Sequence, residues 1–439
     1  MTARRATGYD ILVDYMTTGY WQDQRLPAFV LDPGPDKTIT VNTSGLTAAG
    51  RFLAQNAMEA WETVADITFV ENAASTAQIR FDDNQPAANT RFNYDSNRDA
   101  SFAQINISTD WLAQNGTVTG AYSFQTYMHE IGHALGLGHP GEYNGGNVVW
   151  DSSHSRADSY QLSLMSYFGQ DENPYTVASR AAAVTPMLAD ILAIQRVYGA
   201  ASGGATAGTT VYGVGATLGT YLGDYQRDGY VTGIPLPYAA TFTIFDEGGI
   251  DTIDLSHHGK PQIIKLAPGG ISDVIGQVGN MIIMPGTVIE NYIAGFGADN
   301  IAGNRAGNLI DGGRGDDVIR GAAGADTLRG GDHDDRLIGG AGGDLLTGGR
   351  GNDVMRGGRG VDVFVFGQGE DVIVDFNPHD SLRFEDTLWN GRRDVSIAEI
   401  MDQAQVTADG VVFDFGRLGS LTLAGWTRLP DLADHTGLA

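Results

Sequence analysis

The first 200 residues alternate between helical and strand-like hydrophobic patterns. Over residues 47–61 apolar side chains recur at helical spacing, which predicts an amphipathic helix. Residues 123–137 predict a second helix, and residues 186–198 a third, which has a proline at its start and a glycine after its end. Short β-branched and aromatic runs predict strands at 38–41, 67–70 and 79–81. This part of the chain is therefore predicted to be an α+β domain in which helices pack on a sheet.

The second half has a different pattern, beginning after a joint at 200–209 that is rich in Gly, Ala, Ser and Thr. Short β-type runs come first, at 240–245, 263–266 and 281–284. A polar position then recurs every nine residues, at Asp299, Asn308, Asp317, Asp326, Asp335, Asp344, Asp353 and Asp362. Two residues after each of these lies an apolar position, at Ile301, Ile310, Ile319, Leu328, Leu337, Leu346, Met355 and Phe364.

This period matches the nonapeptide G-G-x-G-x-D-x-U-x, the calcium-binding β-helix repeat. Each unit is expected to supply a Gly-rich turn and a short strand, and two units form one coil with the U residues inside. Carbonyl groups of the turns and the Asp carboxylates would bind calcium between turns. A disordered Gly/Asp-rich linker is the alternative, but the unbroken apolar column argues against it.

The expected calcium ligands of the repeats are the turn glycines and the aspartates: Gly295, Gly297, Asp299, Gly313, Gly315, Asp317, Gly324, Asp326, Gly331, Asp335, Gly340, Gly342, Asp344, Gly349, Gly351, Asp353, Gly358, Gly360 and Asp362. Four positions depart from the motif, namely Asn308, Ala306, Ala322 and His333. We expect weaker calcium binding at those turns. Because rows of carboxylates would repel one another, this segment is predicted to fold only when calcium neutralises them.

Composition narrows the possible functions. With 27 basic and 53 acidic residues the net charge is −26, which argues against a nucleic-acid partner. Cysteine is absent, so disulfides, thiolate zinc sites and thiol nucleophiles are excluded, and a metal must use His, carboxylate, Tyr or carbonyl ligands. No apolar run suggests an N-terminal Sec signal or a membrane span.

The most specific chemical motif is His129-Glu130-x-x-His133, followed by Gly136 and His139. On a helix, residues i and i+4 share one face, so both imidazoles can reach one cation. Gly136 permits a left-handed turn, after which His139 can return as a third ligand. Three neutral ligands with an open position suit a catalytic zinc, with Glu130 as the proton acceptor. A His-x-x-x-His pair alone is often a surface coincidence, but the additional residues favour zinc.

This extended motif, together with His139-Pro140, Glu142-Tyr143 and Met165-Ser166-Tyr167, is similar to that of the serralysins, the secreted RTX metalloproteases of the metzincin clan. The resemblance covers nearly the whole chain. It implies an α+β metzincin catalytic domain over residues 1–207 and an all-β C-terminal domain over 208–439. The latter would hold the RTX repeats at 294–365 in a parallel β-roll, and a β-sandwich and secretion region at 366–439.

The resemblance also implies roles for individual residues. Met165 would form the Met-turn beneath the zinc, and Tyr167 would be a reversible zinc ligand that stabilises the oxyanion. Asp158 either orients the site or is a buried structural carboxylate. A first calcium site would consist of Gly208, Asp246, Gly248 and Asp251, although Thr206 and Thr209 depart from the family's pattern there.

The resemblance implies a zinc endopeptidase with one catalytic zinc and several structural calcium ions. It would be secreted by a Gram-negative bacterium and would hydrolyse extracellular proteins. A proteinaceous periplasmic inhibitor and a type I exporter are the implied partners, and the chain is expected to be an exported monomer without an N-terminal signal peptide. A catalytically inactive RTX calcium-binding or adhesion protein is the alternative, and the intact Glu130 argues against it. An RTX adhesin or S-layer module would leave the zinc motif unexplained. The segment between Phe81 and His129 is shorter than in the serralysins, so the strand that pairs with substrate is not assigned.

Overall fold

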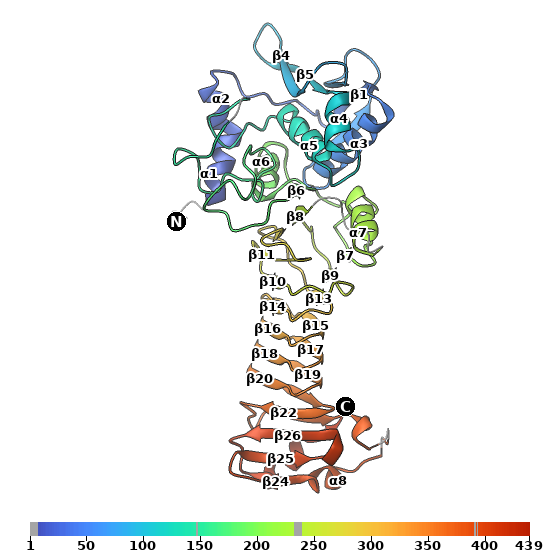
Figure 1. Ribbon diagram of the computed structural model, residues 1–439, viewed down its shortest axis with the longest axis vertical. Coiled ribbons are helices and arrows are strands. Elements are labelled where there is room, and N and C mark those ends of the chain that lie inside the picture. Colours follow the sequence, from blue (N-terminus) through green and yellow to red (C-terminus); the bar gives the residue numbers. More distant parts are fainter. Residues whose placement is uncertain (1–7, 146–147, 232–238, 390–391, 393) are drawn as a thin grey trace. The chain divides into compact units, whose positions relative to one another are not determined.

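The computed structural model describes residues 8–145, 148–231, 239–389, 392 and 394–439 (Figure 1). They form two compact units. The first comprises Met1–Gly208, Leu218–Glu247 and Gln277–Met284. The second comprises Thr209–Thr217, Gly248–Gly276 and Pro285–Ala439. Two segments beyond the predicted boundary at 207/208, Leu218–Glu247 and Gln277–Met284, thus belong to the first unit. The predicted domain limits stay a prediction.

The first unit contains a five-stranded sheet with the strand order β2-β1-β3-β5-β4. Its strands are β1 Thr38–Gly45, β2 Thr68–Glu71, β3 Ile79–Asp82, β4 Ala88–Tyr94 and β5 Ala100–Ile107. Neighbouring strands are parallel except for β4, which pairs antiparallel with β5 and forms one edge of the sheet. The sequence pattern predicted β1, β2 and β3, which are confirmed, whereas β4 and β5 were not predicted.

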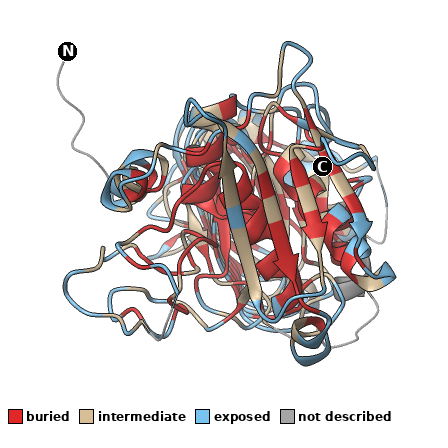
Figure 2. Ribbon diagram, turned by 90° about the horizontal axis from the view of Figure 1, so that it is seen from above, coloured by how far each residue is buried: buried red, intermediate tan, exposed pale blue. Residues whose placement is uncertain are grey.

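The two longest helices of this unit pack against each other. They are α3 Ala48–Glu62 and α5 Tyr122–Ala134, and the indole of Trp61 on α3 donates a hydrogen bond to Met128 O on α5 (3.1 Å). The first unit also contains α1 Gly8–Asp14, a π-helix Tyr15–Gly19, α2 Tyr20–Asp23, α4 Thr109–Asn115, α6 Leu188–Tyr198, α7 Tyr221–Val231, β6 Ala182–Ala183, β8 Ala240–Ile244 and β12 Met281–Ile283. Figure 2 shows buried positions concentrated in the strands and helices and exposed positions mainly in the outer loops. None of the described helices has the length and apolar character needed to span a bilayer.

The second unit contains two nine-stranded sheets, to which successive strands of the repeats contribute alternately. One has the order β10-β14-β16-β18-β20-β22-β26-β25-β24 and the other β27-β23-β21-β19-β17-β15-β13-β9-β7. Strands pair in parallel with partners 18 residues away, as Ile310 with Leu328 and Leu328 with Leu346. All eight predicted U residues are fully buried, which confirms the predicted parallel β-roll. The region from 366 onwards continues both sheets and adds the antiparallel strands β24 and β25.

The strands of the second unit are β7 Val211–Gly213, β9 Thr252–Asp254, β10 Ile263–Lys265, β11 Ile271–Ser272, β13 Asn291–Ile293, β14 Asn300–Ala302, β15 Leu309–Arg314, β16 Val318–Ala323, β17 Thr327–Asp332, β18 Arg336–Ala341, β19 Leu345–Arg350, β20 Val354–Arg359, β21 Val363–Phe366, β22 Gly369–Ile373, β23 Ser381–Phe384, β24 Ala404–Val406, β25 Gly410–Asp414, β26 Gly419–Ala424 and β27 Thr436–Leu438. Its helical segments are the 3₁₀ turns Asp386–Trp389, Gly416–Leu418 and Leu429–His435, and α8 Ile397–Met401.

Candidate metal centre

Three histidines of the first unit converge on one point. His129 and His133 lie one turn apart on α5, and their ligand nitrogens lie with that of His139 within 4.8 Å of one another, the single such group found among the described residues. The helix ends at Ala134, earlier than the predicted residue 137, because Gly136 adopts a left-handed conformation (φ 99°). A Cβ at this position would collide with the carbonyl oxygen of Phe29. This reversal brings His139 back towards the helix, as the motif predicted.

Backbone carbonyls fix the tautomer of all three imidazoles. Each Nδ1 donates a hydrogen bond to a carbonyl oxygen, the acceptors being Leu164 O for His129 (2.9 Å), Leu137 O for His133 (2.8 Å) and Tyr143 O for His139 (2.7 Å). Since a carbonyl oxygen only accepts, each Nε2 is left unprotonated. The Nε2 atoms of His133 and His139 are 3.0 Å apart, so two lone pairs face each other and a cation between them would relieve the repulsion. Burial also lowers the pKa of His129 to about 4 and that of His133 to about 3, which keeps both rings neutral. This donor set fits a zinc ion.

A buried carboxylate supports the carbonyl behind His129. Asp190, on α6, accepts hydrogen bonds from Ser163 Oγ (2.6 Å) and from the backbone N–H of Leu164 (2.7 Å). It also accepts one from the N–H of Met187 (2.9 Å) at the start of α6. These bonds fix the turn whose carbonyl orients His129. Burial raises the pKa of Asp190 to about 7.

A second buried carboxylate supports the carbonyl behind His139. Asp158 accepts hydrogen bonds from the hydroxyls of Tyr143 (3.0 Å) and Ser166 (2.6 Å). Tyr143 is the residue whose carbonyl oxygen holds the His139 ring. Of the two readings of Asp158, these contacts favour the one in which it orients the site.

Glu130 lies beside the first histidine on α5 and is almost fully buried (7% exposed). Its carboxylate accepts a hydrogen bond from Thr90 Oγ1 (2.7 Å), which reaches it from the edge strand β4. Burial raises the pKa of Glu130 to about 7. Thr90 was missed in the sequence because β4 itself was not predicted.

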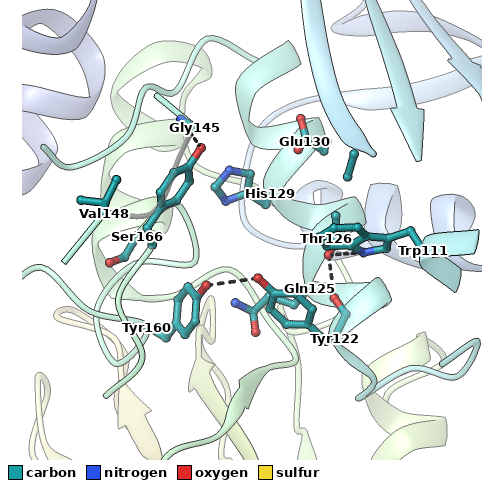
Figure 3. Close-up of a pocket in the computed structure, with 12 residues that line it drawn as sticks. Trp111, Tyr122, Gln125, Thr126, His129, Glu130, Gly145, Val148, Tyr160 and Ser166 are labelled. Carbon is teal, nitrogen blue, oxygen red and sulfur yellow. Dashed lines mark hydrogen bonds between the residues drawn. The ribbon is translucent and has the colours of Figure 1, made fainter. Parts of the chain in front are cut away.

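A pocket of about 760 Å³ opens beside His129 and Glu130 (Figure 3). Aromatic side chains form much of its wall, namely Trp111, Tyr122, Tyr160 and Tyr167. Its remaining lining residues are Ala88, Gln125, Thr126, Gly145, Val148 and Ser166, so neither Lys nor Arg is among the described residues that line it.

The structure also places the two residues that the resemblance assigned near the zinc. The Tyr167 hydroxyl accepts a hydrogen bond from the N–H of Gly145 (3.2 Å), and its ring centroid is 4.5 Å from that of His139. Met165 is fully buried, and its sulfur packs so closely against Gly132 on α5 that a Cβ there would lie 2.7 Å away. Both therefore lie at the three-histidine cluster, while their chemical roles stay predictions.

The aspartates of the second unit form two continuous rows. In each row the backbone N–H of one residue donates to Oδ1 of the aspartate 18 residues later, at 2.6–3.0 Å. The second carboxylate oxygen, Oδ2, is buried and accepts no hydrogen bond in Asp299, Asp317, Asp326, Asp335, Asp344, Asp353, Asp362 and Asp371. A row of buried, unpaired carboxylate oxygens is costly without cations, and oxygen ligands of this kind suit calcium. Burial raises the pKa of Asp317 to about 7 and those of Asp335 and Asp371 to about 8.

The rows extend beyond the predicted repeats at both ends. Asp371 and Asp380 continue the nine-residue interval, so the sequence contained this signal although the prediction stopped at 365. At the other end the intervals are longer, and no period could have revealed them. There the N–H of Asp251 donates to Glu290 Oε2 (2.9 Å), and the N–H of Gln262 donates to Asp299 Oδ1 (2.7 Å).

Asp251 was expected in a first calcium site with Gly208, Asp246 and Gly248. Its Oδ1 accepts a hydrogen bond from the N–H of Thr210 (2.8 Å), and its buried Oδ2 accepts none. Gly208 and Asp246 belong to the first unit, whereas Gly248 and Asp251 belong to the second. This ligand set therefore stays a prediction.

Except for Gly295 and Gly297, the turn glycines predicted as ligands in the repeats adopt positive φ angles where a neighbouring coil approaches. At Gly331 (φ 119°), for example, a Cβ would collide with the carbonyl oxygen of Gly313. Two non-glycine residues in the motif keep the same conformation, Ala322 (φ 82°) and His333 (φ 87°). The backbone of the roll is thus maintained at these two breaks in the motif.

Comparison with known proteins gives matches to both parts of the chain. Residues 39–145 match the family model described as Matrixin, and residues 204–407 match the one described as Peptidase M10 serralysin C terminal. The chain is 35% identical over 298 residues to Metallopeptidase AprA of Pseudomonas marginalis, covering 62% of this chain and 58% of the relative. It is 44% identical over 182 residues to Serralysin C of Dickeya chrysanthemi, covering 40% of this chain and 36% of the relative.

A third relative, Metalloprotease AprA of Pseudomonas entomophila, is 36% identical over 270 residues, covering 58% of this chain and 53% of the relative. The chain thus spans between about a third and three fifths of the length of these relatives. Among solved structures, high choriolytic enzyme 1, a hatching enzyme zinc-protease from Oryzias latipes, matches 38% of this chain and 92% of its own at 15% identity, with a TM-score of 0.26.

Proposed function

The chain belongs to the serralysin-type metzincins, and from this premise we propose that it is a zinc-dependent endopeptidase. The observation that carries the proposal is the cluster of three neutral imidazoles with Glu130 beside it, at the side of a pocket. His129, His133 and His139 would hold the zinc. The bound ion would supply Lewis-acid polarisation and a water of lowered pKa.

In this proposal the protein's own residues manage the protons and the developing charge. Glu130 takes a proton from the attacking water and delivers it to the leaving amine. Tyr167 hydrogen-bonds the oxyanion after it leaves the N–H of Gly145. Asp158 and Asp190 keep the carbonyls that orient the His139 and His129 rings in place.

We further propose that the substrate binds as an extended chain along β4. Among the described residues this strand pairs only with β5, so its other edge is available for backbone hydrogen bonds. Ala88, at the start of β4, lines the same pocket as Glu130. A side chain next to the scissile bond would enter this pocket, whose aromatic wall favours large apolar residues.

The aspartate rows support a second part of the proposal, namely that the second unit binds several calcium ions and folds around them. The buried, unpaired Oδ2 atoms support this assignment. Export in an unfolded state through a type I exporter, followed by folding in extracellular calcium, is consistent with such a requirement. A periplasmic protein inhibitor and a monomeric state are further proposals that follow from the family.

Hydrolysis of casein by the purified full chain tests the enzymatic function. Activity should disappear with the zinc chelator 1,10-phenanthroline and return with added zinc. The matched variant Glu130→Gln should retain one zinc per chain while its kcat falls by a factor of about 10² to 10⁴, because it loses the base but no ligand. Activity that resists the chelator, or a Glu130→Gln variant with wild-type turnover, would contradict the proposal.

A further inference from the structure

The carboxylate of Glu130 is held by one residue. Thr90 Oγ1 lies 2.7 Å from Glu130 Oε2, and no other described residue donates a hydrogen bond to this carboxylate. The same hydroxyl lies 3.0 Å from Glu130 O, but it has a single proton, and the charged oxygen is both the nearer and the stronger acceptor. Without Thr90 nothing in the described structure would fix the orientation of the carboxylate.

Thr90 is itself held in a fixed position. Alternate residues of a strand share one face, so Ala88, Thr90 and Phe92 lie on the same side of β4. Phe92 packs against Trp21 (centroids 5.3 Å apart) and Phe29 (4.8 Å), which anchors this side of the strand in an aromatic cluster. Ala88 lines the pocket. Thr90 therefore lies on β4 between Phe92, which is packed in the aromatic cluster, and Ala88, which lines the pocket. Its hydroxyl is within hydrogen-bond distance of Glu130, the proposed general base.

We propose that Thr90 is a positioning residue that couples the substrate-binding edge strand to the general base. The inference rests on the proposed peptidase function and deepens it. A peptide pairing with β4 would be held on the same backbone that carries the Thr90 hydroxyl. Strand β4 would then hold the substrate and also carry the hydroxyl that orients Glu130. This would fix the distance between the scissile bond and the Glu130 carboxylate, which favours proton transfer once the substrate is bound.

Thr90→Val tests this inference, because valine keeps the β-branched shape that suits a strand and removes only the hydroxyl. We expect kcat for a peptide substrate to fall by about 10- to 100-fold, the range associated with a misplaced catalytic group. KM should change by less than about twofold, because the backbone of β4 is unchanged. Zinc stoichiometry should stay at one per chain, since the hydrogen bonds of the Thr90 hydroxyl go to Glu130 and to none of the three histidines.

Two further variants keep the test decisive. Thr90→Ser retains the hydroxyl and should recover most of the wild-type kcat. Thr68→Val makes the same change at an exposed threonine on β2, the opposite edge strand of this sheet, and should leave kcat unchanged. Melting temperatures of all three variants separate a loss of catalysis from a loss of folding.

The outcomes distinguish the inference from the proposed function. Wild-type kcat in Thr90→Val, or a Thr90→Ser variant as impaired as Thr90→Val, would overturn the role of Thr90 while leaving the peptidase assignment in place. A rise in KM of about 10- to 100-fold with an unchanged kcat would also overturn it, because this would indicate a role in substrate binding. A wild-type chain without chelator-sensitive peptidase activity would overturn both.

Discussion

The two candidate metal-binding regions differ in how their ligands are arranged before an ion binds. In the three-histidine cluster the ligands are neutral, and backbone carbonyls hold each ring with its Nε2 towards the common point. In the carboxylate rows the candidate ligands are anions stacked along the roll with buried, unpaired oxygens. The first arrangement is stable through hydrogen bonds of the protein itself. The second concentrates negative charge that the protein does not neutralise.

Under the proposed function, one protein therefore uses metals in two thermodynamic ways. A centre built from neutral, hydrogen-bonded ligands can form before the ion binds, so that the ion adds chemistry. Rows of carboxylates gain most of their stability from the ion, so that binding and folding are one process.

Removing calcium should cause the largest change. In full-length protein with excess EGTA, amide protons of the repeat strands β15–β20 should lose nearly all protection from hydrogen exchange, while those of α5 stay protected. Millimolar calcium should restore protection. Removing zinc alone should abolish peptidase activity and leave exchange in both regions close to that of the intact protein. Fully protected repeat strands in EGTA would show that calcium does not drive the folding of the roll.

Tyr167→Phe tests the chemical side of the comparison. Loss of the phenolic hydroxyl should lower kcat by roughly 10- to 1000-fold, as expected for one donor to an oxyanion, with zinc stoichiometry unchanged. Tyr175→Phe, at an exposed tyrosine outside the pocket lining, is the matched control and should retain wild-type kcat. An unchanged kcat in Tyr167→Phe would remove this residue from the proposed mechanism, and loss of zinc would make it primarily a ligand.

The carboxylate rows should also respond to pH when calcium is absent. Burial raises the pKa of Asp335 and Asp371 to about 8, so these groups take up protons on folding between their ordinary pKa of about 4 and pH 8. The stability of the calcium-free roll should therefore fall as pH rises across this window.

Circular dichroism of calcium-depleted, dialysed protein measures this effect. In the absence of calcium the strand signal should be larger at pH 5 than at pH 8. In millimolar calcium the urea concentration that unfolds the roll should be higher at pH 8 than at pH 5, because calcium competes with protons for the same oxygens. A calcium-free roll that becomes more stable with rising pH would show that other groups dominate its titration.

The sequence predicted those features whose residues lie close together along the chain, and it missed those that tertiary packing brings together. The three clustered histidines lie within 11 residues of sequence, and helical geometry with one glycine reversal is sufficient to bring them together. The carboxylates that support them, Asp158 and Asp190, come from later segments, and their contacts depend on tertiary packing. Thr90 lies on a strand whose weak apolar alternation gave no prediction.

The repeats show the same limit. Equal spacing predicted the strands and the aspartate rows, and would have extended them to Asp371 and Asp380. It could not extend them backwards, because Asp251 and Glu290 are separated by 39 residues although they are neighbours in one row. Loops inserted between coils remove the period from the sequence while the hydrogen-bonded ladder keeps its order in space.

The smallest predicted effect concerns Ala322 and His333, the two motif breaks that have a positive φ. Ala322 and His333 adopt left-handed conformations that L-residues with a Cβ avoid, at a cost of about 1 kcal/mol each. Both side chains are exposed, so replacing them removes little packing. Ala322→Gly and His333→Gly should each raise the unfolding free energy of the calcium-bound roll by about 1 kcal/mol, as measured by urea denaturation. Ala323→Gly, the matched control without a positive φ, should instead lower it by about 0.5–1 kcal/mol. If both substitutions behaved like the control, the left-handed strain would not limit the stability of these turns, and the cost of breaking the motif would have to lie in calcium binding.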